Sequence, residues 1–209
     1  MADLRAPGRA PRLCFVGPFA GARPGYVVTQ GVRLSGHFRS AGYVVTAVSQ
    51  FPNRYARLLD IAWTLIRRAR AIDILVLEVY GGASFVVEDV ASLLGRLFGH
   101  GIVMILHGGA MPEFMARFPR WSRCVLRRAH AIVAPSAFLA RAVVPHGFTC
   151  RIIPNVIDLQ LYPFRHRRAL KPRLLWMRSF HPVYNPLMAV RVLECLQTTH
   201  PDATLVMGG

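Results

Sequence analysis

The sequence predicts an α/β fold in which helices flank a parallel sheet, followed by the first β-α-β unit of a second sheet. Two observations lead to this prediction. Apolar runs of strand length alternate with longer segments whose apolar residues recur every three or four positions, which is the pattern of parallel β-α-β units. The alternation stops over residues 154–172, where proline, asparagine and a basic run replace it, and it restarts at residue 173.

Each expected strand is a short apolar run that glycine, proline or a polar residue ends. The first is Leu-Cys-Phe-Val, which Gly17 and Pro18 follow. The fourth is Ile-Val-Met-Ile-Leu, which runs into His107. In chain order the expected strands are 13–16, 43–48, 72–79, 102–106, 131–134, 151–153, 173–177 and 203–207.

The segments between the strands have helical periodicity and recognisable ends. Ser136 is placed to cap the N-terminus of one helix, and Gly147 is placed to end it. Another helix has one apolar face and carries most of its arginines away from that face; the apolar face consists of Tyr55, Leu58, Leu59, Ala62, Leu65 and Ile66. In chain order the expected helices are 26–41, 53–71, 84–99, 112–128, 136–146 and 186–200.

This pattern divides the chain into two Rossmann-like domains of unequal length. Residues 1–153 are expected to form an N-terminal domain, residues 154–172 an interdomain linker, and residues 173–209 part of a C-terminal domain. With 209 residues, of which 53% are hydrophobic, the chain can bury a core. A parallel strand that ends in glycines normally leads into a helix, so we expect the C-terminal domain to be cut off after its first unit.

The net charge of +16 comes from 26 basic and 10 acidic residues, and Lys171 is the single lysine. Two explanations stay open. The arginine excess reflects codon usage in a GC-rich genome, or it creates a field that attracts phosphate groups of nucleotide diphosphates, anionic lipids or nucleic acids. No groove-reading motif or set of stacking aromatics accompanies the charge, so no specific nucleic-acid partner is expected.

Cysteine usage and the N-terminus favour the cytoplasm. The four cysteines form no C-x-x-C pair and three of them lie in apolar runs, where reduced cysteine acts as a small hydrophobic residue. The first twelve residues are charged and interrupted by proline, unlike a signal peptide. No charge-free apolar run reaches 18 residues, so any membrane contact is expected to be peripheral.

The expected helix 112–128 is a candidate for such a contact at the inner face of the membrane. It places Arg117, Arg120, Arg123 and Arg127 at spacings of three and four, with aromatic residues beside them. A basic, aromatic helix of this kind lies on anionic membranes. The alternative is an arginine face that is simply solvated above a domain core.

Ligands of open parallel sheets bind beyond the carboxyl ends of the strands, and four loops there carry candidate residues. Gly21 and Gly25 precede a helix and let backbone N–H groups approach a phosphate. Glu78 ends the third strand and either contacts a ligand or is paired locally. The fourth strand ends in His107, and the adjacent glycines Gly108 and Gly109 leave room for a ligand.

The fourth loop follows the first strand of the C-terminal domain. Arg178 is placed there to hold a diphosphate through two N–H groups of its guanidinium. Asn185 begins the next helix. Glu113, in contrast, is expected to be a charge that favours the start of its helix. The sequence has no HExxH motif, no Cys/His ligand spacing, no P-loop and no G-x-S-x-G, which argues against a metalloenzyme, a P-loop ATPase and an α/β-hydrolase.

Three short motifs follow one another along the chain. The stretch 36–46, Gly-His-Phe-Arg-Ser-Ala-Gly-Tyr-Val-Val-Thr, joins the first expected helix to the second expected strand, and the Ala-Pro-Ser that ends at Ser136 joins a strand to a helix. Pro154, Asn155, Val156 and Asp158 follow the sixth expected strand, and Leu-Tyr-Pro-Phe comes shortly after. In this order the motifs resemble those of the retaining family 4 glycosyltransferases of the GT-B fold, whose signature is Pro-Asn-Gly-Val-Asp; here Val156 and the isoleucine after it stand where Gly-Val is usual. The resemblance spans nearly the whole chain.

This resemblance implies transfer of a sugar from a nucleotide-sugar co-substrate to a carbohydrate, lipid-linked or small-molecule acceptor, with retention, without a metal and without another cofactor. His107 then corresponds to the family histidine that contacts the transferring sugar. Gly21 and Gly25 correspond to the loop that faces the donor phosphates, and Arg178 to the arginine at the diphosphate. The family lysine near that arginine is absent, and Asn185 begins the helix instead.

The family's paired glutamates would lie beyond Gly209, so we expect the chain as given to bind nucleotide sugars weakly and turn over slowly. An alternative function is a non-catalytic, Rossmann-like binding module, derived from a glycosyltransferase, that associates with a membrane or a partner. The sequence predicts no oligomeric state.

Overall fold

The computed structural model describes residues 9–19, 28–166 and 171–209. The chain divides into two compact units, Met1–Ile157 and Asp158–Gly209. The division falls inside the segment 154–172, where the sequence predicts a linker.

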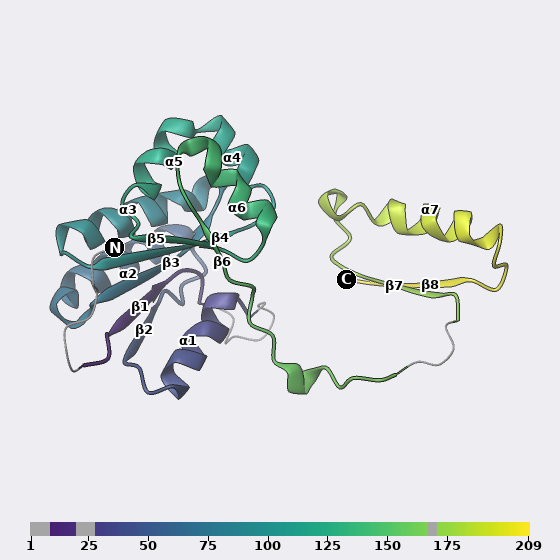
Figure 1. Cartoon of the computed structure of the whole chain (residues 1–209), viewed down its shortest axis with the longest axis horizontal. Helices are drawn as coiled ribbons and strands as arrows, with labels where there is room; N and C mark the ends of the chain where they lie inside the picture. Colours follow the sequence, from purple (N-terminus) through teal and green to yellow (C-terminus); the bar gives the residue numbers. More distant parts are fainter. Residues whose placement is uncertain (1–8, 20–27, 167–170) are drawn as a thin grey trace. The chain divides into compact units, whose positions relative to one another are not determined.

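In the described part of the first unit, six strands form one parallel sheet in the order β2-β1-β3-β4-β5-β6 (Figure 1). Every strand overlaps a predicted one, and the α/β, Rossmann-like fold predicted from the sequence is confirmed. Because β1 lies between β2 and β3, the chain reverses its direction of winding there, and such a switch point is where open α/β sheets bind ligands. The strands are β1 Leu13–Val16, β2 Val45–Val48, β3 Ile74–Tyr80, β4 Gly101–His107, β5 Ala131–Ala134 and β6 Arg151–Ile152.

Helices cover the two faces of this sheet unequally. Helix α1 (Gln30–Ser40) packs on one face, where Phe15 and Val76 form a small core. The other face carries the larger core and a layer of several helices (Figure 1). These are α2 Arg54–Arg67, α3 Phe85–Leu97, α4 Met111–Arg117, α5 Pro119–Leu126 and α6 Ala137–Val143.

Local side-chain chemistry sets several helix ends. The side chain of Asn53 accepts the backbone N–H groups of Tyr55 and Ala56 at the start of α2. Ser136 caps α6, as predicted, and accepts the N–H of Leu139. Gly147 ends this region at a φ of +82°, a left-handed conformation that glycine adopts without strain. Short 3₁₀ helices occur at Ala69–Ala71, Gly82–Ser84, Val144–His146, Leu159–Leu161 and Pro182–Tyr184.

The single helix predicted over 112–128 is wrong, because the chain forms α4 and α5 with a break between them. Phe118 lies at the break with φ −124° and ψ 58°. Proline at position 119 disfavours a helical conformation in the residue before it and has no N–H to donate. The four arginines of this segment therefore do not follow one another along one helix.

Two of the three aromatic residues of this segment pack against the core, whereas Phe118 is exposed. The rings of Phe114 and Trp121 each lie 4.9 Å, between centroids, from the ring of Phe85 in α3. Phe114 is buried and Trp121 is half-buried, so these rings are already used in packing α4 and α5 onto α3.

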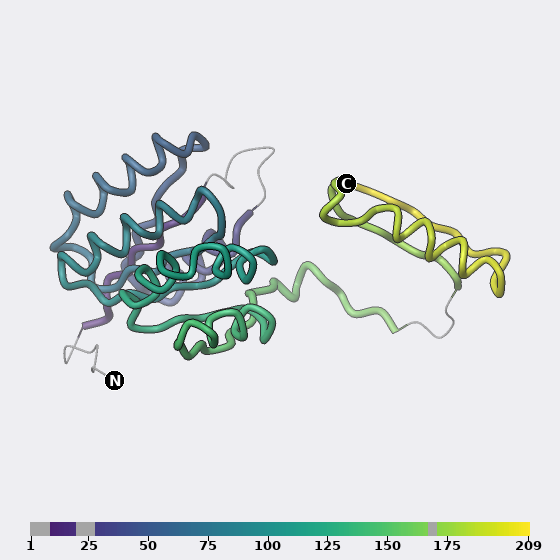
Figure 2. Tube along the Cα trace, turned by 90° about the horizontal axis from the view of Figure 1, so that it is seen from above, coloured from purple at the N-terminus to yellow at the C-terminus, as the bar shows by residue number. Residues whose placement is uncertain are grey.

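The second unit contains one β-α-β unit, as predicted. Strands β7 (Arg173–Met177) and β8 (Thr204–Gly208) pair in parallel. Helix α7 (Pro186–Gln197) connects them and lies along both strands (Figure 2).

Candidate functional site

The carboxyl ends of β3 and β4 bring two predicted residues together. In the parallel register Tyr80 lies opposite His107, and Glu78 lies opposite Ile105. Side chains of a strand alternate between its faces, so the side chains of Glu78 and His107 project from the same face of the sheet, the face that α1 covers.

Glu78 and His107 form a buried contact between a carboxylate and an imidazole. Oε2 of Glu78 lies 3.1 Å from Nε2 of His107, and the two side chains are 1% and 9% exposed. The pair is not aligned as a hydrogen bond, and among the described residues neither carboxylate oxygen of Glu78 has a hydrogen-bond partner. Glu78 thus contacts His107, and its contact with a ligand stays a prediction. A carboxylate at this distance restricts the orientation of the imidazole ring.

Two glycines make room for the Glu78 side chain. A Cβ atom at Gly17 would lie 2.9 Å from Cβ of Glu78, and one at Gly31 would lie 2.8 Å from its Cδ. Both distances are shorter than ordinary contacts between carbon atoms. Gly17 follows β1 and Gly31 is in the first turn of α1, so the buried carboxyl group lies between these two elements.

Tyr80 is a third member of the site, and it was not predicted. Its ring stacks on the ring of His107 with a centroid distance of 5.0 Å and an interplanar angle of 20°. Burial, together with the nearby charges of Glu78 and Glu88, raises the pKa of Tyr80 to about 12. The phenol therefore keeps its proton and can donate a hydrogen bond. The sequence did contain a signal for it, because Tyr80 comes two residues after Glu78 and therefore lies on the same face of the strand.

Glu88 places a second buried carboxyl group near the switch point. It lies in α3 and lines a pocket of about 330 Å³ together with Gly17, Arg57 and Tyr80. Burial raises its pKa to about 8, against the opposing effect of nearby backbone N–H groups and of the Arg57 charge. Among the described residues, its Oε2 has no hydrogen-bond partner. Near neutral pH this group is a neutral carboxylic acid, which can both donate and accept a hydrogen bond.

A larger, mostly apolar pocket of about 390 Å³ lies on the α1 face of the sheet. Phe15 and Ile105 are among its walls, and Glu78 and His107 also line it. The site thus has apolar space on one side of the buried pair, and at the strand ends it has a pocket that contains Arg57 and Glu88.

Comparison with solved structures identifies the architecture. The chain is similar to a protein from Listeria monocytogenes named as a UDP-N-acetylglucosamine 2-epimerase, with a TM-score of 0.51 and 12% identity over 96% of this chain. The fold is GT-B-like. The match covers 63% of the Listeria chain, so this chain spans less than two thirds of that protein's length. The sequence matches no protein-family model and no curated protein.

In this GT-B-like chain, the structure explains glycine at one of the two positions after His107 and not at the other. Gly108 has a φ of +84°, which explains glycine there through backbone conformation. A Cβ atom at Gly109 would have no neighbour within 4 Å among the described residues, and nothing in the structure requires glycine at that position. Glu113 is exposed in the first turn of α4, consistent with a helix-start charge.

The remaining predicted site residues lie elsewhere. Gly21 and Gly25 fall outside the described residues. Arg178 belongs to the second unit, where its guanidinium lies 4.3 Å from the ring centroid of Tyr184. Asn185 precedes α7 with a φ of 48°, and its side chain makes no capping hydrogen bond. Its amide is therefore not used in capping this helix.

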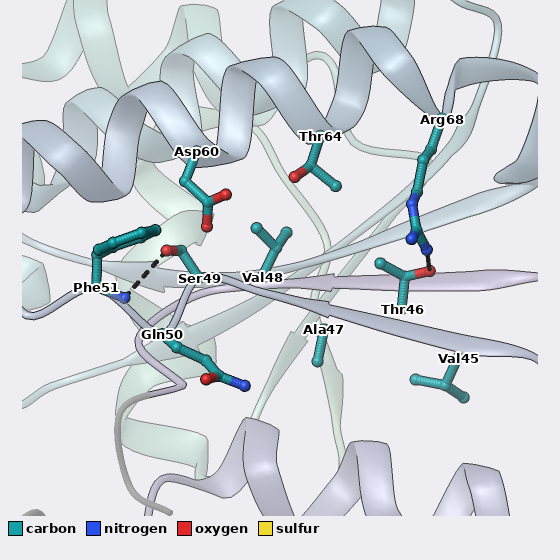
Figure 3. A pocket seen from close by; sticks show the side chains of 10 residues that line it. All are labelled: Val45, Thr46, Ala47, Val48, Ser49, Gln50, Phe51, Asp60, Thr64 and Arg68. Atoms are coloured by element: carbon teal, nitrogen blue, oxygen red, sulfur yellow. Dashed lines mark hydrogen bonds between the residues drawn. The ribbon is translucent and has the colours of Figure 1, made fainter. Parts of the chain in front are cut away.

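Another pocket, of about 480 Å³, lies between the edge strand β2 and α2 (Figure 3). Asp60, Thr64 and Arg68 project into it from α2, and Arg68 Nη1 lies 3.5 Å from Oγ1 of Thr46. Its charged groups lie on the helix, away from the buried carboxyl groups. In the described part of the chain, no helix is long and apolar enough to cross a membrane.

Proposed function

We propose that the chain acts on a nucleotide sugar and transfers the sugar to a carbohydrate, lipid-linked or small-molecule acceptor. The observation that carries this proposal is the buried Glu78–His107 pair, stacked on Tyr80, at the strand ends of a GT-B-like sheet. Retention of configuration and independence from metal ions are part of the proposal, and they rest on the resemblance to family 4 glycosyltransferases.

In this proposal His107 is the residue that contacts the transferring sugar. Glu78 acts through it, because its Oε2 lies 3.1 Å from Nε2 and restricts the orientation of the imidazole ring. Tyr80 covers one face of the ring. Gly21 and Gly25 would approach the donor phosphates, and Arg178 with Asn185 would hold the diphosphate that departs, since a guanidinium stabilises negative charge as it develops.

Epimerisation of a nucleotide sugar is the second candidate, and the similarity to a protein named as a UDP-N-acetylglucosamine 2-epimerase favours it. Both reactions begin with a bound nucleotide sugar, and they differ in the product. Transfer yields a glycoside and a free nucleoside diphosphate, whereas epimerisation yields a nucleotide sugar with one inverted carbon.

Replacing His107 tests the proposed site. We expect His107→Ala to lower the release of nucleoside diphosphate from UDP- or GDP-activated sugars by at least about tenfold, equivalent to about 1.4 kcal/mol of transition-state stabilisation. The assay uses the full chain at concentrations near that of the donor, so that slow turnover is measurable. His37→Ala, which removes an exposed histidine of α1, is the matched control and should leave the rate unchanged.

Product analysis by NMR separates the two reactions. A glycoside with retained anomeric configuration supports transfer, and a nucleotide sugar of altered ring configuration supports epimerisation. Equal rates for wild type and His107→Ala would show that His107 is not part of the site.

Arg178→Ala is expected to weaken donor binding without altering the fold of the first unit, which circular dichroism and thermal unfolding can check.

A further inference from the structure

Helix α2 exposes a continuous row of large apolar side chains. Tyr55, Leu59, Trp63 and Ile66 are between 52% and 71% exposed, and their spacings of four, four and three place them on one side of the helix. A different side of α2 packs into the core through Ile61 and Leu65, which are fully buried. The apolar face predicted for this helix is therefore only partly used in packing, and much of it faces outward.

Helix α3 continues this row on the neighbouring helix. Val86, Leu93 and Leu97 are between 41% and 74% exposed and lie along one side of α3, at spacings of seven and four. The two helices pack against each other on the same face of the sheet, so both rows lie on the outer surface of one helical layer. These seven residues are named the α2–α3 surface below. Contiguous apolar surface of this kind marks an interaction site rather than scattered exposure.

Arginines border the α2–α3 surface with almost no acidic residues to offset them. Arg54, Arg67 and Arg70 are exposed in or directly after α2, and Asp60 is the single acidic residue of that helix. The acidic residues of α3 are internally engaged, since Glu88 is buried and Asp89 pairs with Arg128.

Two of the arginines also contact aromatic rings of the surface. The guanidinium carbon of Arg54 lies 4.9 Å from the ring centroid of Tyr55, and that of Arg67 lies 5.8 Å from the ring of Trp63. Each contact places a cation directly beside an amphipathic ring, the arrangement that suits the headgroup level of a lipid membrane.

We propose that the α2–α3 surface binds the surface of an anionic lipid membrane, with the apolar row in the acyl boundary and the arginines at the headgroups. Charge favours this occupant over a second copy of the chain. Two copies with a net charge of +16 each would bring arginines against arginines, whereas anionic headgroups neutralise them. The inference does not depend on glycosyl transfer. It assigns the contact to α2 and α3, because Phe114 in α4 and Trp121 in α5 pack on Phe85 and leave Phe118 as the one exposed ring of that segment.

Co-sedimentation of the full chain with vesicles tests the proposal. We expect binding to vesicles of phosphatidylglycerol and phosphatidylcholine in equal parts, little binding to pure phosphatidylcholine, and weaker binding as salt is raised. The double variant Leu59→Ser/Trp63→Ser should bind at least about tenfold more weakly, since each buried apolar side chain contributes to interfacial binding. Phe138→Ser, which removes an exposed ring of α6, is the matched control and should bind as wild type does.

Tryptophan emission reports directly on the orientation. A blue shift on adding anionic vesicles is expected for wild type and should be lost in Trp63→Phe, which keeps the row apolar and should still sediment with the vesicles. Equal binding to both vesicle types, no binding to either, or unchanged binding of the double variant would each overturn the proposal.

Sedimentation velocity without lipid completes the test, because a dimer that Leu59→Ser dissociates would assign the surface to a second copy instead.

Discussion

The free energy of unfolding of the first unit is expected to fall as pH rises from 5 to 8, and Glu88→Gln should remove much of that fall. Burial raises the pKa of Glu88 from 4.5 to about 8 in the folded chain. Between these values the folded state holds a proton that the unfolded state releases, so the unfolded state is favoured as pH rises. The free energy of unfolding then falls by up to about 1.4 kcal/mol per pH unit, and this dependence vanishes above the pKa of Glu88 in the folded chain.

Urea unfolding at pH 5 and pH 8 measures this effect. It is followed through the emission of Trp121, which packs against the core of the first unit, in a background where Trp63 and Trp176 are replaced by phenylalanine. Relative to wild type, Glu88→Gln should be more stable at pH 8 than at pH 5 by about 2–4 kcal/mol. Asp60→Asn, which neutralises a half-buried carboxylate on α2, is the control. The same wild-type-to-variant difference at both pH values would mean that Glu88 ionises normally in the folded chain.

Phe85→Ala is expected to lower the free energy of unfolding by about 3–5 kcal/mol, the usual range for removing a buried aromatic ring. Phe85 is 1% exposed and its ring contacts those of Phe114 and Trp121. Its loss leaves a cavity where α3, α4 and α5 meet. Because α3 also carries Glu88, loosening this junction should reach the candidate site.

Phe138→Ala, at an exposed position of α6, is the comparison, and it should change stability by no more than about 0.5 kcal/mol. Urea unfolding at one pH measures both variants. A loss below about 1 kcal/mol for Phe85→Ala would show that the three rings do not hold the helices together.

Much of the fold could be predicted because local signals agree with the tertiary structure. Every apolar run that was predicted to be a strand forms one. Ser136 and Gly147 lie at the helix ends where they were predicted. The position of His107 was also predictable, since an apolar run that ends in a polar residue places that residue at the carboxyl edge. These features depend on residues near one another in the chain.

Features that depend on distant residues could not be predicted. The contact of Glu78 with His107 follows from the β3–β4 register, and no single strand encodes that register. Gly17 and Gly31 matter because Glu78 lies between them, which their own sequence surroundings do not show. Which apolar residues of α2 would be buried could not be predicted, because the apolar face of this helix is wider than the core that it covers.

The break between α4 and α5, in contrast, had a visible signal in the sequence, which is the proline at position 119.

The place of β1 in the middle of the sheet also affects when the site can form during synthesis. β1 pairs with β2 on one side and β3 on the other, so β1 completes its pairing only after residue 77 has emerged from the ribosome. Until then one edge of β1 stays open. Exposed strand edges recruit wrong partners, and early N-terminal segments face this risk for as long as translation takes. In this chain Gly17, which makes room for Glu78, and the carboxylate itself are therefore brought together by the same pairing of β1 with β3.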